Sequence, residues 1–423
     1  MDRNGDDTEE ERRKVSNILT FAKITPSAAL TISKLDLFQC GLDSLPSNLP
    51  QICPQLEILF LFKNKFEEVP EVIGACPNLQ MVSFKSNKLT SIHPEALQPQ
   101  LRWCILTDNC LENIPDTIGR CVKLQKLMLS GNKIKKLPSE ISMCTNLELV
   151  RLSSNLIEEP PIDLLSIPAL SWVALSDNPF LDNETRDSIR VGIYPDIQKT
   201  ETVLAGEVLG KGASGITRKV KTDKGSYVAV KKYVSNITSD GNPIEERKAS
   251  IAASSLECSS MIKVLGETNC CGSLVMELLE GYSVLANPPS MKTCTRDVYR
   301  TDLTLTASVA REFVYQLLNA LTAIHSIGLC HGDFYGHNIL YLINDGGTSI
   351  KLSDFGAAFF YDKEALYGSL VEEIEIRAFS HLVEELLQLV DDSCKIRDQL
   401  QSIIRVSRDP SIGSFKDIAA ILS

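Results

Sequence analysis

Apolar and polar positions in the first half of the chain recur with a period of 22 or 23 residues. An asparagine closes each unit and a leucine stands eight positions before it, so each unit reads L-x-x-L-x-L-x-x-N with apolar substitutions. The six asparagines are Asn64, Asn87, Asn109, Asn132, Asn155 and Asn178. With an earlier, imperfect copy that begins at Ile32, the pattern predicts about seven units over residues 30–182.

Each predicted unit contributes a short strand and a return segment, and its apolar face can be buried only against neighbouring units. The asparagine of a unit can satisfy backbone groups where the chain turns, which predicts a structural role for the ladder. Prolines such as Pro70, Pro115 and Pro138 stand in the return segments and predict irregular backbone there.

The alternation within each predicted strand indicates which side chains face away from the core. In L-x-x-L-x-L, the third and fifth residues point outward when the leucines point inward. Large apolar residues occupy many of these outward positions: Phe60, Met81, Trp103, Ile105, Met128 and Trp172. Because a contiguous exposed apolar stripe usually marks a binding site, we expect a protein partner on this face. The alternative is that the second half of the chain or a flanking segment covers the stripe.

Composition and charge indicate which partners and which cellular compartment to expect. The chain has 43 basic and 54 acidic residues and a net charge of −11, so nucleic acid is not an expected partner. Residues 1–29 are expected to form a charged helical cap, and no stretch approaches the roughly 20 apolar residues of a membrane span. The 13 cysteines lack paired metal spacing and are interpreted as reduced thiols. We therefore expect a cytoplasmic protein that does not insert into membranes.

The repeat pattern stops after Pro195, and residues 183–203 are predicted to connect it to a second domain over residues 204–423. There a strand leads into Gly210, Gly212 and Gly215, and β-type residues ending in Lys231 follow. A dinucleotide-binding fold would need a helix at this point, so the pattern favours a glycine-rich hairpin. Glycines let backbone N–H groups approach phosphates, and the lysine adds a positive charge.

Further elements follow in a fixed order. Residues 274–278 read as a strand that leads to a hinge, and residues 310–326 read as an apolar-periodic helix. Next come the triplet His331-Gly332-Asp333 with Asn338 five residues after the aspartate, and then Asp354-Phe355-Gly356 after a predicted strand. Each motif alone has an ordinary structural interpretation, but the ordered set makes those interpretations improbable together.

This set resembles the signature of protein kinases, and the repeats resemble intracellular leucine-rich repeats. The chain is therefore similar to leucine-rich-repeat protein kinases. The resemblance implies an α/β chain with an N-terminal solenoid and a C-terminal bilobal α+β domain that uses ATP and Mg²⁺. It implies Asp333 as catalytic base, Asn338 and Asp354 as metal ligands, and an ion pair of Lys231 with Glu246, Glu245 being the other choice. Implied nucleotide-binding residues are Gly210, Gly212, Gly215, Lys231, Met276, Glu277 and Leu279.

Three departures from the family pattern stand out. Gly332 replaces the arginine that usually precedes the catalytic base, and Tyr335 stands where serine/threonine kinases usually keep a lysine. No A-P-E motif follows Asp354, and the sequence around Glu375 already resembles the central helix of the C-terminal lobe. The activation segment is therefore predicted to be unusually short.

The sequence predicts an ATP-dependent protein kinase that phosphorylates serine or threonine, with the repeats as a module that binds a substrate or regulator. Two alternatives remain open. The H-G-D triplet and the missing A-P-E motif also resemble small-molecule phosphotransferases, although the repeats suit a protein substrate better. A pseudokinase scaffold without turnover is the second alternative, although every nucleotide and metal position holds a competent residue.

Overall fold

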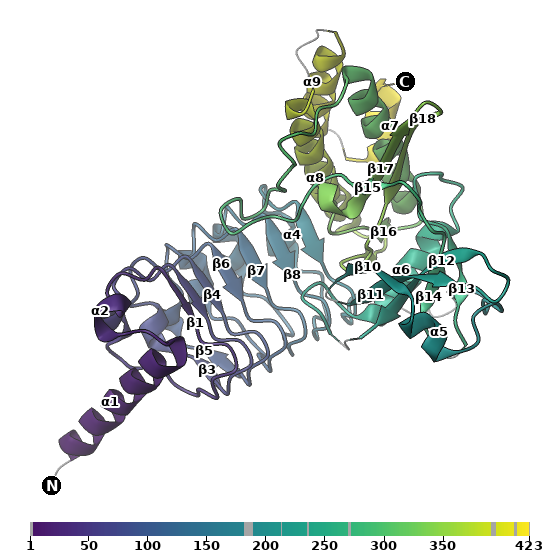
Figure 1. The fold of residues 1–423 in the computed structure, drawn as a ribbon. Coiled ribbons are helices and arrows are strands. Elements are labelled where there is room, and N and C mark those ends of the chain that lie inside the picture. Colours follow the sequence, from purple (N-terminus) through teal and green to yellow (C-terminus); the bar gives the residue numbers. More distant parts are fainter. Residues whose placement is uncertain are drawn as a thin grey trace. The chain divides into compact units, whose positions relative to one another are not determined.

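The computed structural model describes residues 3–181, 189–212, 214–234, 237–269, 272–390, 395–409 and 413–422. The chain forms two compact units. The first comprises residues 1–170 with 178–180, and the second comprises residues 171–177 with 181–423. Each unit is described by itself (Figure 1).

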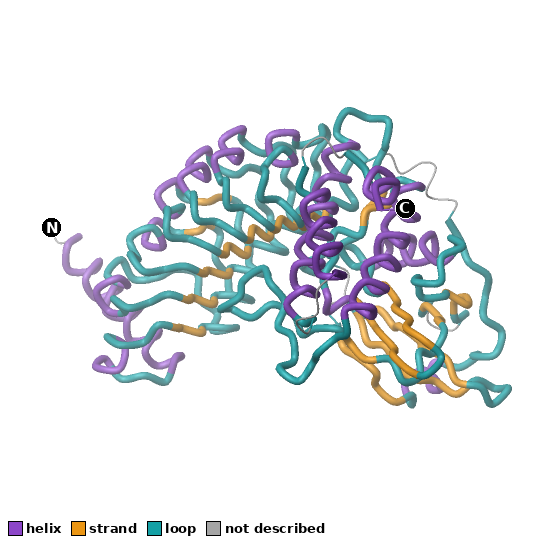
Figure 2. Tube along the Cα trace, turned by 90° about the horizontal axis from the view of Figure 1, so that it is seen from above, coloured by secondary structure: helices purple, strands orange, loops and turns teal. Residues whose placement is uncertain are grey.

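The first unit opens with helices α1 (Arg3–Ala22) and α2 (Pro26–Ala29), so the predicted N-terminal segment is helical. One strand per repeat then pairs in parallel with the next, in the order β1, β2, β4, β6, β7, β8. Figure 2 shows short strands, in orange, recurring along the repeats. Their bounds are Lys34–Asp36, Ile58–Phe60, Met81–Ser83, Trp103–Ile105, Lys126–Met128 and Leu149–Arg151. Equivalent residues are in register, so Met81 stands beside Trp103, and Trp103 beside Lys126.

The return segments contain short helical turns: α3 (Leu49–Ile52), η1 (Glu71–Ile73), η2 (Pro94–Ala96), η3 (Asp116–Arg120), η4 (Ser139–Met143) and α4 (Ile162–Leu165). Strands β3 (Glu68–Val69) and β5 (Ser91–Ile92) form a second small parallel pair. Pro70, Pro115 and Pro138 precede η1, η3 and η4, as expected for irregular returns, because proline lacks an N–H that would otherwise need a partner.

The asparagine ladder ties neighbouring repeats together. The Asn109 amide group donates to the carbonyls of Leu106 in its own repeat and Phe84 in the previous one, and its oxygen accepts the N–H of Leu89. Asn132 repeats this arrangement one unit later. Each side chain thus satisfies buried backbone groups that would otherwise cost free energy, which is the predicted structural role.

Strand β9 (Trp172–Ala174) continues the repeat pattern in sequence but belongs to the second unit. The repeat pattern placed the boundary at residue 182. In the structure, residues 171–177 pack with the residues that follow that boundary, and the physical reason lies in the contacts of Trp172 described below.

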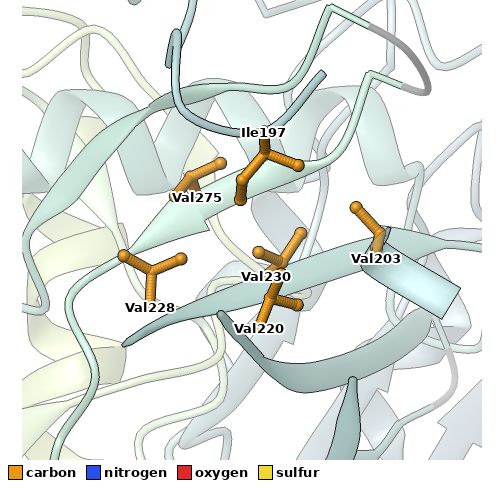
Figure 3. Close-up of a cluster of buried hydrophobic side chains, with 6 residues drawn as sticks. All are labelled: Ile197, Val203, Val220, Val228, Val230 and Val275. Atoms are coloured by element: carbon orange, nitrogen blue, oxygen red, sulfur yellow. The ribbon is translucent and has the colours of Figure 1, made fainter. Parts of the chain in front are cut away.

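After β9, the second unit contains α5 (Thr200–Leu204) and a five-stranded antiparallel sheet of order β10-β11-β12-β14-β13. The strands are Glu207–Lys211, Gly215–Lys221, Tyr227–Tyr233, Leu274–Met276 and Val264–Glu267, and helix α6 (Pro243–Ser254) accompanies them. Val220, Val228, Val230 and Val275 form its buried core, together with Ile197 and Val203 (Figure 3). The predicted connector therefore supplies part of this core.

The rest of the second unit is mainly helical, with α7 (Ala307–Ser326), α8 (Gly368–Gln388), α9 (Lys395–Ser407) and α10 (Phe415–Leu422). Strands β15 (Ser283–Val284), β17 (Ile339–Asn344) and β18 (Gly347–Leu352) form a small sheet, and β16 (Leu329–Cys330) pairs with β19 (Phe359–Phe360). Among the residues that the structure describes, no helix is long and apolar enough to cross a membrane.

Candidate active site

A cavity of about 460 Å³ lies within the second unit. It gathers residues from segments that are far apart in the sequence. The predicted nucleotide and metal residues all line it: Gly210, Gly212, Gly215, Lys231, Met276, Glu277, Leu279, Asn338 and Asp354. Its size and its mixture of apolar walls with few polar groups suit a small-molecule ligand.

Strands β10 and β11 form the glycine hairpin (residues 207–221) over this cavity. The N–H of Gly212 donates to the carbonyl of Gly215 at 2.9 Å. A Cβ atom at Gly215 would lie 2.4 Å from the carbonyl oxygen of Lys232, so that glycine is needed for packing against β12. At Gly210 and Gly212 an added Cβ would meet nothing within 4 Å. These two positions therefore leave open space where a ligand can approach the backbone.

Lys231 on β12 forms an ion pair with Glu246 on α6, and its Nζ lies 3.7 Å from Oδ1 of Asp354. Burial opposes the charge on Lys231, but the carboxylates of Asp354 and Glu246 outweigh it and raise the lysine pKa. The cation is thus held in place at the cavity wall. Glu245, the other choice from the sequence, pairs instead with Lys248 at 3.0 Å.

The Asp333 loop (residues 331–338) carries the H-G-D triplet. Asn338 Nδ2 donates to Asp333 Oδ2 at 2.9 Å and to the Asp333 carbonyl at 2.8 Å, so these two side chains are fixed together. Ser353, which precedes Asp354, donates its hydroxyl and its N–H to the Asn338 carbonyl. The structure therefore brings Asp333, Asn338 and Asp354 together, although 21 residues separate the first from the last.

Glu375 on α8 anchors the Asp333 loop from inside the protein. Its carboxylate accepts the N–H of His331 at 3.0 Å and of Gly332 at 2.7 Å, and it lies 2.6 Å from His325 Nε2. Burial alone would raise its pKa, but the contacts with His325 and His331 outweigh burial and lower it. The sequence predicted a helix around Glu375 but no function for its side chain. An acid among the apolar positions of a buried helix was the available signal.

Gly332 has a φ of +72°, and the absence of a side chain there has a physical cause. A Cβ atom would lie 2.4 Å from the Val173 carbonyl oxygen on β9 and 2.7 Å from the Ala357 carbonyl oxygen. Any larger residue would collide with backbone on two sides. Glycine at position 332, in place of the usual arginine, therefore allows β9 to pack against the Asp333 loop.

His337 lies at the other end of the Asp333 loop. Its ring Nδ1 is 2.7 Å from Asp297 Oδ1, and its backbone N–H donates to Asp297 Oδ2. Its ring Nε2 is 3.9 Å from Asp333 Oδ2. Burial disfavours the charged ring, but the hydrogen bond to Asp297 and the surrounding carboxylates raise the His337 pKa. Asp297 and His337 were not among the residues expected from the sequence, since nothing in their spacing links them.

The predicted exposed stripe needs a correction at Trp172. Its side chain is 1% exposed, its indole N–H donates to the Phe334 carbonyl at 3.0 Å, and its ring stacks on Tyr335 at 4.4 Å. The prediction that Trp172 is available to a partner is therefore wrong, because residues of the Asp333 loop cover it. Met81 is also buried, at 6% exposure, since the strand side chains stand in register beside it.

The other stripe residues, Phe60, Trp103, Ile105 and Met128, are half-buried. The Lys126 ammonium lies 4.5 Å from the centre of the Trp103 ring, so a cation covers part of this aromatic surface. Partner binding at these four residues stays a prediction.

Comparison with known proteins gives two family matches. A model of the protein kinase domain matches residues 204–378, and a leucine rich repeat model matches residues 77–134. Both matches fall on the regions to which the sequence pattern assigned these folds.

A probable serine/threonine-protein kinase of Dictyostelium discoideum is 31% identical over 182 residues, which are 41% of this chain and 34% of that protein. The ovarian-specific serine/threonine-protein kinase Lok of Drosophila melanogaster is 26% identical over 190 residues, 43% of this chain and 37% of that protein. The chain thus spans little more than a third of these relatives. A solved chain of the TLR13–ssRNA13 complex matches 36% of this chain and 22% of its own length, with 19% identity. The TM-score of this match is 0.33.

Proposed function

We propose that this chain, a leucine-rich-repeat protein with a protein kinase domain, transfers the γ-phosphate of ATP to serine or threonine hydroxyls of a protein substrate. The observation that carries this proposal is the meeting of Lys231, Asn338 and Asp354 around one cavity beneath a glycine hairpin, with the Asp333 carboxylate hydrogen-bonded to Asn338. Phosphoryl transfer requires a cation, carboxylates and a backbone that phosphates can approach closely.

The cavity suits ATP with a divalent cation, and we propose Mg²⁺. Asp354 and Asn338 offer oxygen atoms at the cavity wall, and oxygen is the ligand type that Mg²⁺ prefers. The Asp354 side chain is half exposed, so a carboxylate oxygen remains accessible to an ion. When bound, Mg²⁺ neutralises charge that develops on the phosphate oxygens.

The protein groups have separate tasks in this proposal. Lys231, held by Glu246, contributes a positive charge toward the phosphates, and Met276, Glu277 and Leu279 border the adenine region. Asp333 orients the acceptor hydroxyl and accepts its proton, while Asn338 fixes the Asp333 carboxylate. Glu375 holds the backbone that carries Asp333.

The acceptor and the compartment are also proposals. The names of the curated relatives favour serine and threonine as acceptors. The repeats favour a protein substrate or regulator, bound at Phe60, Trp103, Ile105 and Met128. We propose a cytoplasmic location, since the ten described cysteines are free thiols.

The test uses the purified chain with labelled ATP, Mg²⁺ and casein, alongside an extract of small metabolites. Wild-type protein should label casein, and Asp333→Asn should lower turnover by about 10²–10⁴-fold while ATP binding persists. Equal rates in the two proteins would support a scaffold, and labelling only of small metabolites would support a small-molecule phosphotransferase.

A further inference from the structure

The Trp172 side chain occupies a position that the proposed function does not yet explain. Besides Phe334 and Tyr335, its ring lies 5.4 Å from the His381 ring and 5.1 Å from the Arg296 guanidinium carbon. The plane of the Trp172 ring and the plane of the Tyr335 ring differ by 7°, which is a stacked arrangement. The indole therefore contacts the two residues that directly follow Asp333.

The backbone of β9 contacts the residue on the other side of Asp333. The Val173 carbonyl oxygen lies so close to Gly332 that a Cβ would stand 2.4 Å from it. Glu375 meanwhile accepts the Gly332 N–H from the opposite direction. The residue before Asp333, Gly332, is thus contacted by the Val173 carbonyl of β9 and by Glu375 of α8. The two residues after Asp333 are contacted by the Trp172 side chain.

From these contacts we infer that Trp172 is a positioning residue for Asp333, so that the last strand of the repeats takes part in catalysis by fixing the Asp333 loop. This inference rests on the proposed function. A proton-accepting carboxylate needs accurate placement, and a shift of about 1 Å can cost about 10²-fold in rate. The loop lacks the arginine through which a phosphorylated segment could fix it, and β9 provides the fixation instead.

Two features separate this role from ordinary core packing. Trp172 and Tyr335 are not among the residues that line the cavity, so nucleotide binding does not depend on direct contact with them. The indole also makes a directional hydrogen bond to the Phe334 carbonyl, whose place in the chain directly follows Asp333. Truncation should therefore change turnover more than ATP affinity.

The experiment compares full-length wild type, Trp172→Ala and Trp172→Phe, with Leu318→Ala as the control for lost core volume. Leu318 is buried in α7 of the same unit, and α7 contributes no residue to the cavity lining. For each protein, thermal unfolding, the dissociation constant for ATP, and kcat and KM with casein are measured below the unfolding transition.

We expect Trp172→Ala to lower kcat by about 10²-fold while the dissociation constant for ATP stays within about threefold. Trp172→Phe keeps the stacked ring but loses the indole N–H, so its kcat should recover to within about tenfold of wild type. Leu318→Ala should lose stability without this change in kcat.

The inference is overturned if Trp172→Ala keeps wild-type kcat, if its ATP affinity falls as much as its kcat, or if Leu318→Ala loses as much turnover. It is also overturned if both Trp172 variants unfold, since the residue then serves the fold alone. These outcomes leave the proposed function standing as long as wild type is active and Asp333→Asn is not. An inactive wild type would overturn the function and the inference together.

Discussion

The carboxylate of Glu375 accepts the backbone N–H of Gly332 at 2.7 Å, which links the centre of α8 to the residue before Asp333. Glu375→Gln would replace one acceptor oxygen by an NH₂ group, which is a donor, beside the backbone N–H groups of His331 and Gly332. The loss of charge-assisted hydrogen bonds should lower the free energy of unfolding by about 1–3 kcal/mol. Chemical denaturation of the variant measures this change.

The matched control is Glu373→Gln on the same helix, whose partly buried carboxylate lies 3.9 Å from Arg377 Nη1. That variant should stay within about 0.5 kcal/mol of wild type, because an i,i+4 pair at this distance contributes little. Equal losses in the two variants would contradict the anchoring role of Glu375.

Gly332→Ala tests the close approach of β9 to the Asp333 loop. The φ of +72° alone costs an alanine about 1 kcal/mol, and the collision with the Val173 carbonyl adds to this. We expect a loss of more than about 2 kcal/mol in unfolding free energy, with reduced turnover.

Gly225→Ala is the control for Gly332→Ala. Gly225 also has a positive φ, of +87°, but an added Cβ would meet nothing within 4 Å. Its replacement should cost only the strain of the backbone conformation, about 1 kcal/mol. A Gly332 variant that is no worse than this control would show that β9 can move away without cost.

Glu385 makes stability depend on pH. Burial raises its pKa to about 7, although the hydrogen bond from Tyr299 at 2.8 Å opposes this shift. Between the unfolded pKa near 4.5 and the folded pKa, the folded protein holds a proton that the unfolded chain has lost. Stability contributed by Glu385 is therefore complete below the unfolded pKa and declines as pH rises through the folded value.

Glu385→Gln should accordingly stabilise the protein at pH 8 by about 1–3 kcal/mol, and change it little at pH 4.5. Thermal unfolding across this range measures the difference. The control is Glu384→Gln on the same helix, whose half-exposed carboxylate pairs with Arg408 and not with Tyr299. A Glu385 variant with the wild-type pH profile would mean that the carboxyl group titrates normally.

Activity should not require phosphorylation of the segment between Asp354 and Glu375. Gly332 offers no cation to a phosphate on Tyr361, Tyr367 or Ser369. The two tyrosines are buried in the structure, and Ser369 is exposed. Phosphatase treatment of the purified protein should leave the rate within a few fold. A collapse of the rate, restored by incubation with ATP, would show that another basic residue binds the phosphate.

Trp103 carries the remaining test of partner binding. Replacement by alanine should cost about 2 kcal/mol of affinity for a protein partner, about thirtyfold, since large aromatics dominate interface energetics. The measurement is the binding of a partner from cell extract to immobilised wild type and to each immobilised variant. Met143→Ala is the control, because Met143 is exposed on the return segment η4. Equal retention by both variants would place the partner elsewhere.

The sequence predicted the repeats and the cavity residues because both depend on local spacing. The asparagine ladder follows from a period of 22 or 23 residues, and the glycine hairpin from turns and strands adjacent in the chain. Spacing was less informative for Glu246, where the count left Glu245 as a second choice. The two residues point to different partners, Lys231 and Lys248, and only the rotation of α6 decides between them.

Trp172 and Glu375 show what alternation cannot predict. The period of a strand or helix assigns a side chain to one face, but it does not say which distant segment covers that face. Trp172 lies 162 residues before its hydrogen-bond partner Phe334, and Glu375 lies 43 residues after Gly332. Such long-range contacts leave no periodic signal in a single sequence.

The membership of residues 171–177 in the second unit bears on how the protein can be divided. A fragment that starts after the last repeat, at residue 183, would lack the ring stacked on Tyr335 and the donor to the Phe334 carbonyl. It would expose an aromatic face and an unsatisfied backbone carbonyl beside Asp333, and both favour aggregation or a displaced loop. A fragment meant to keep the Asp333 loop in place must therefore begin no later than Ser171. For the same reason, the second unit could not be moved to another protein without carrying one repeat strand along.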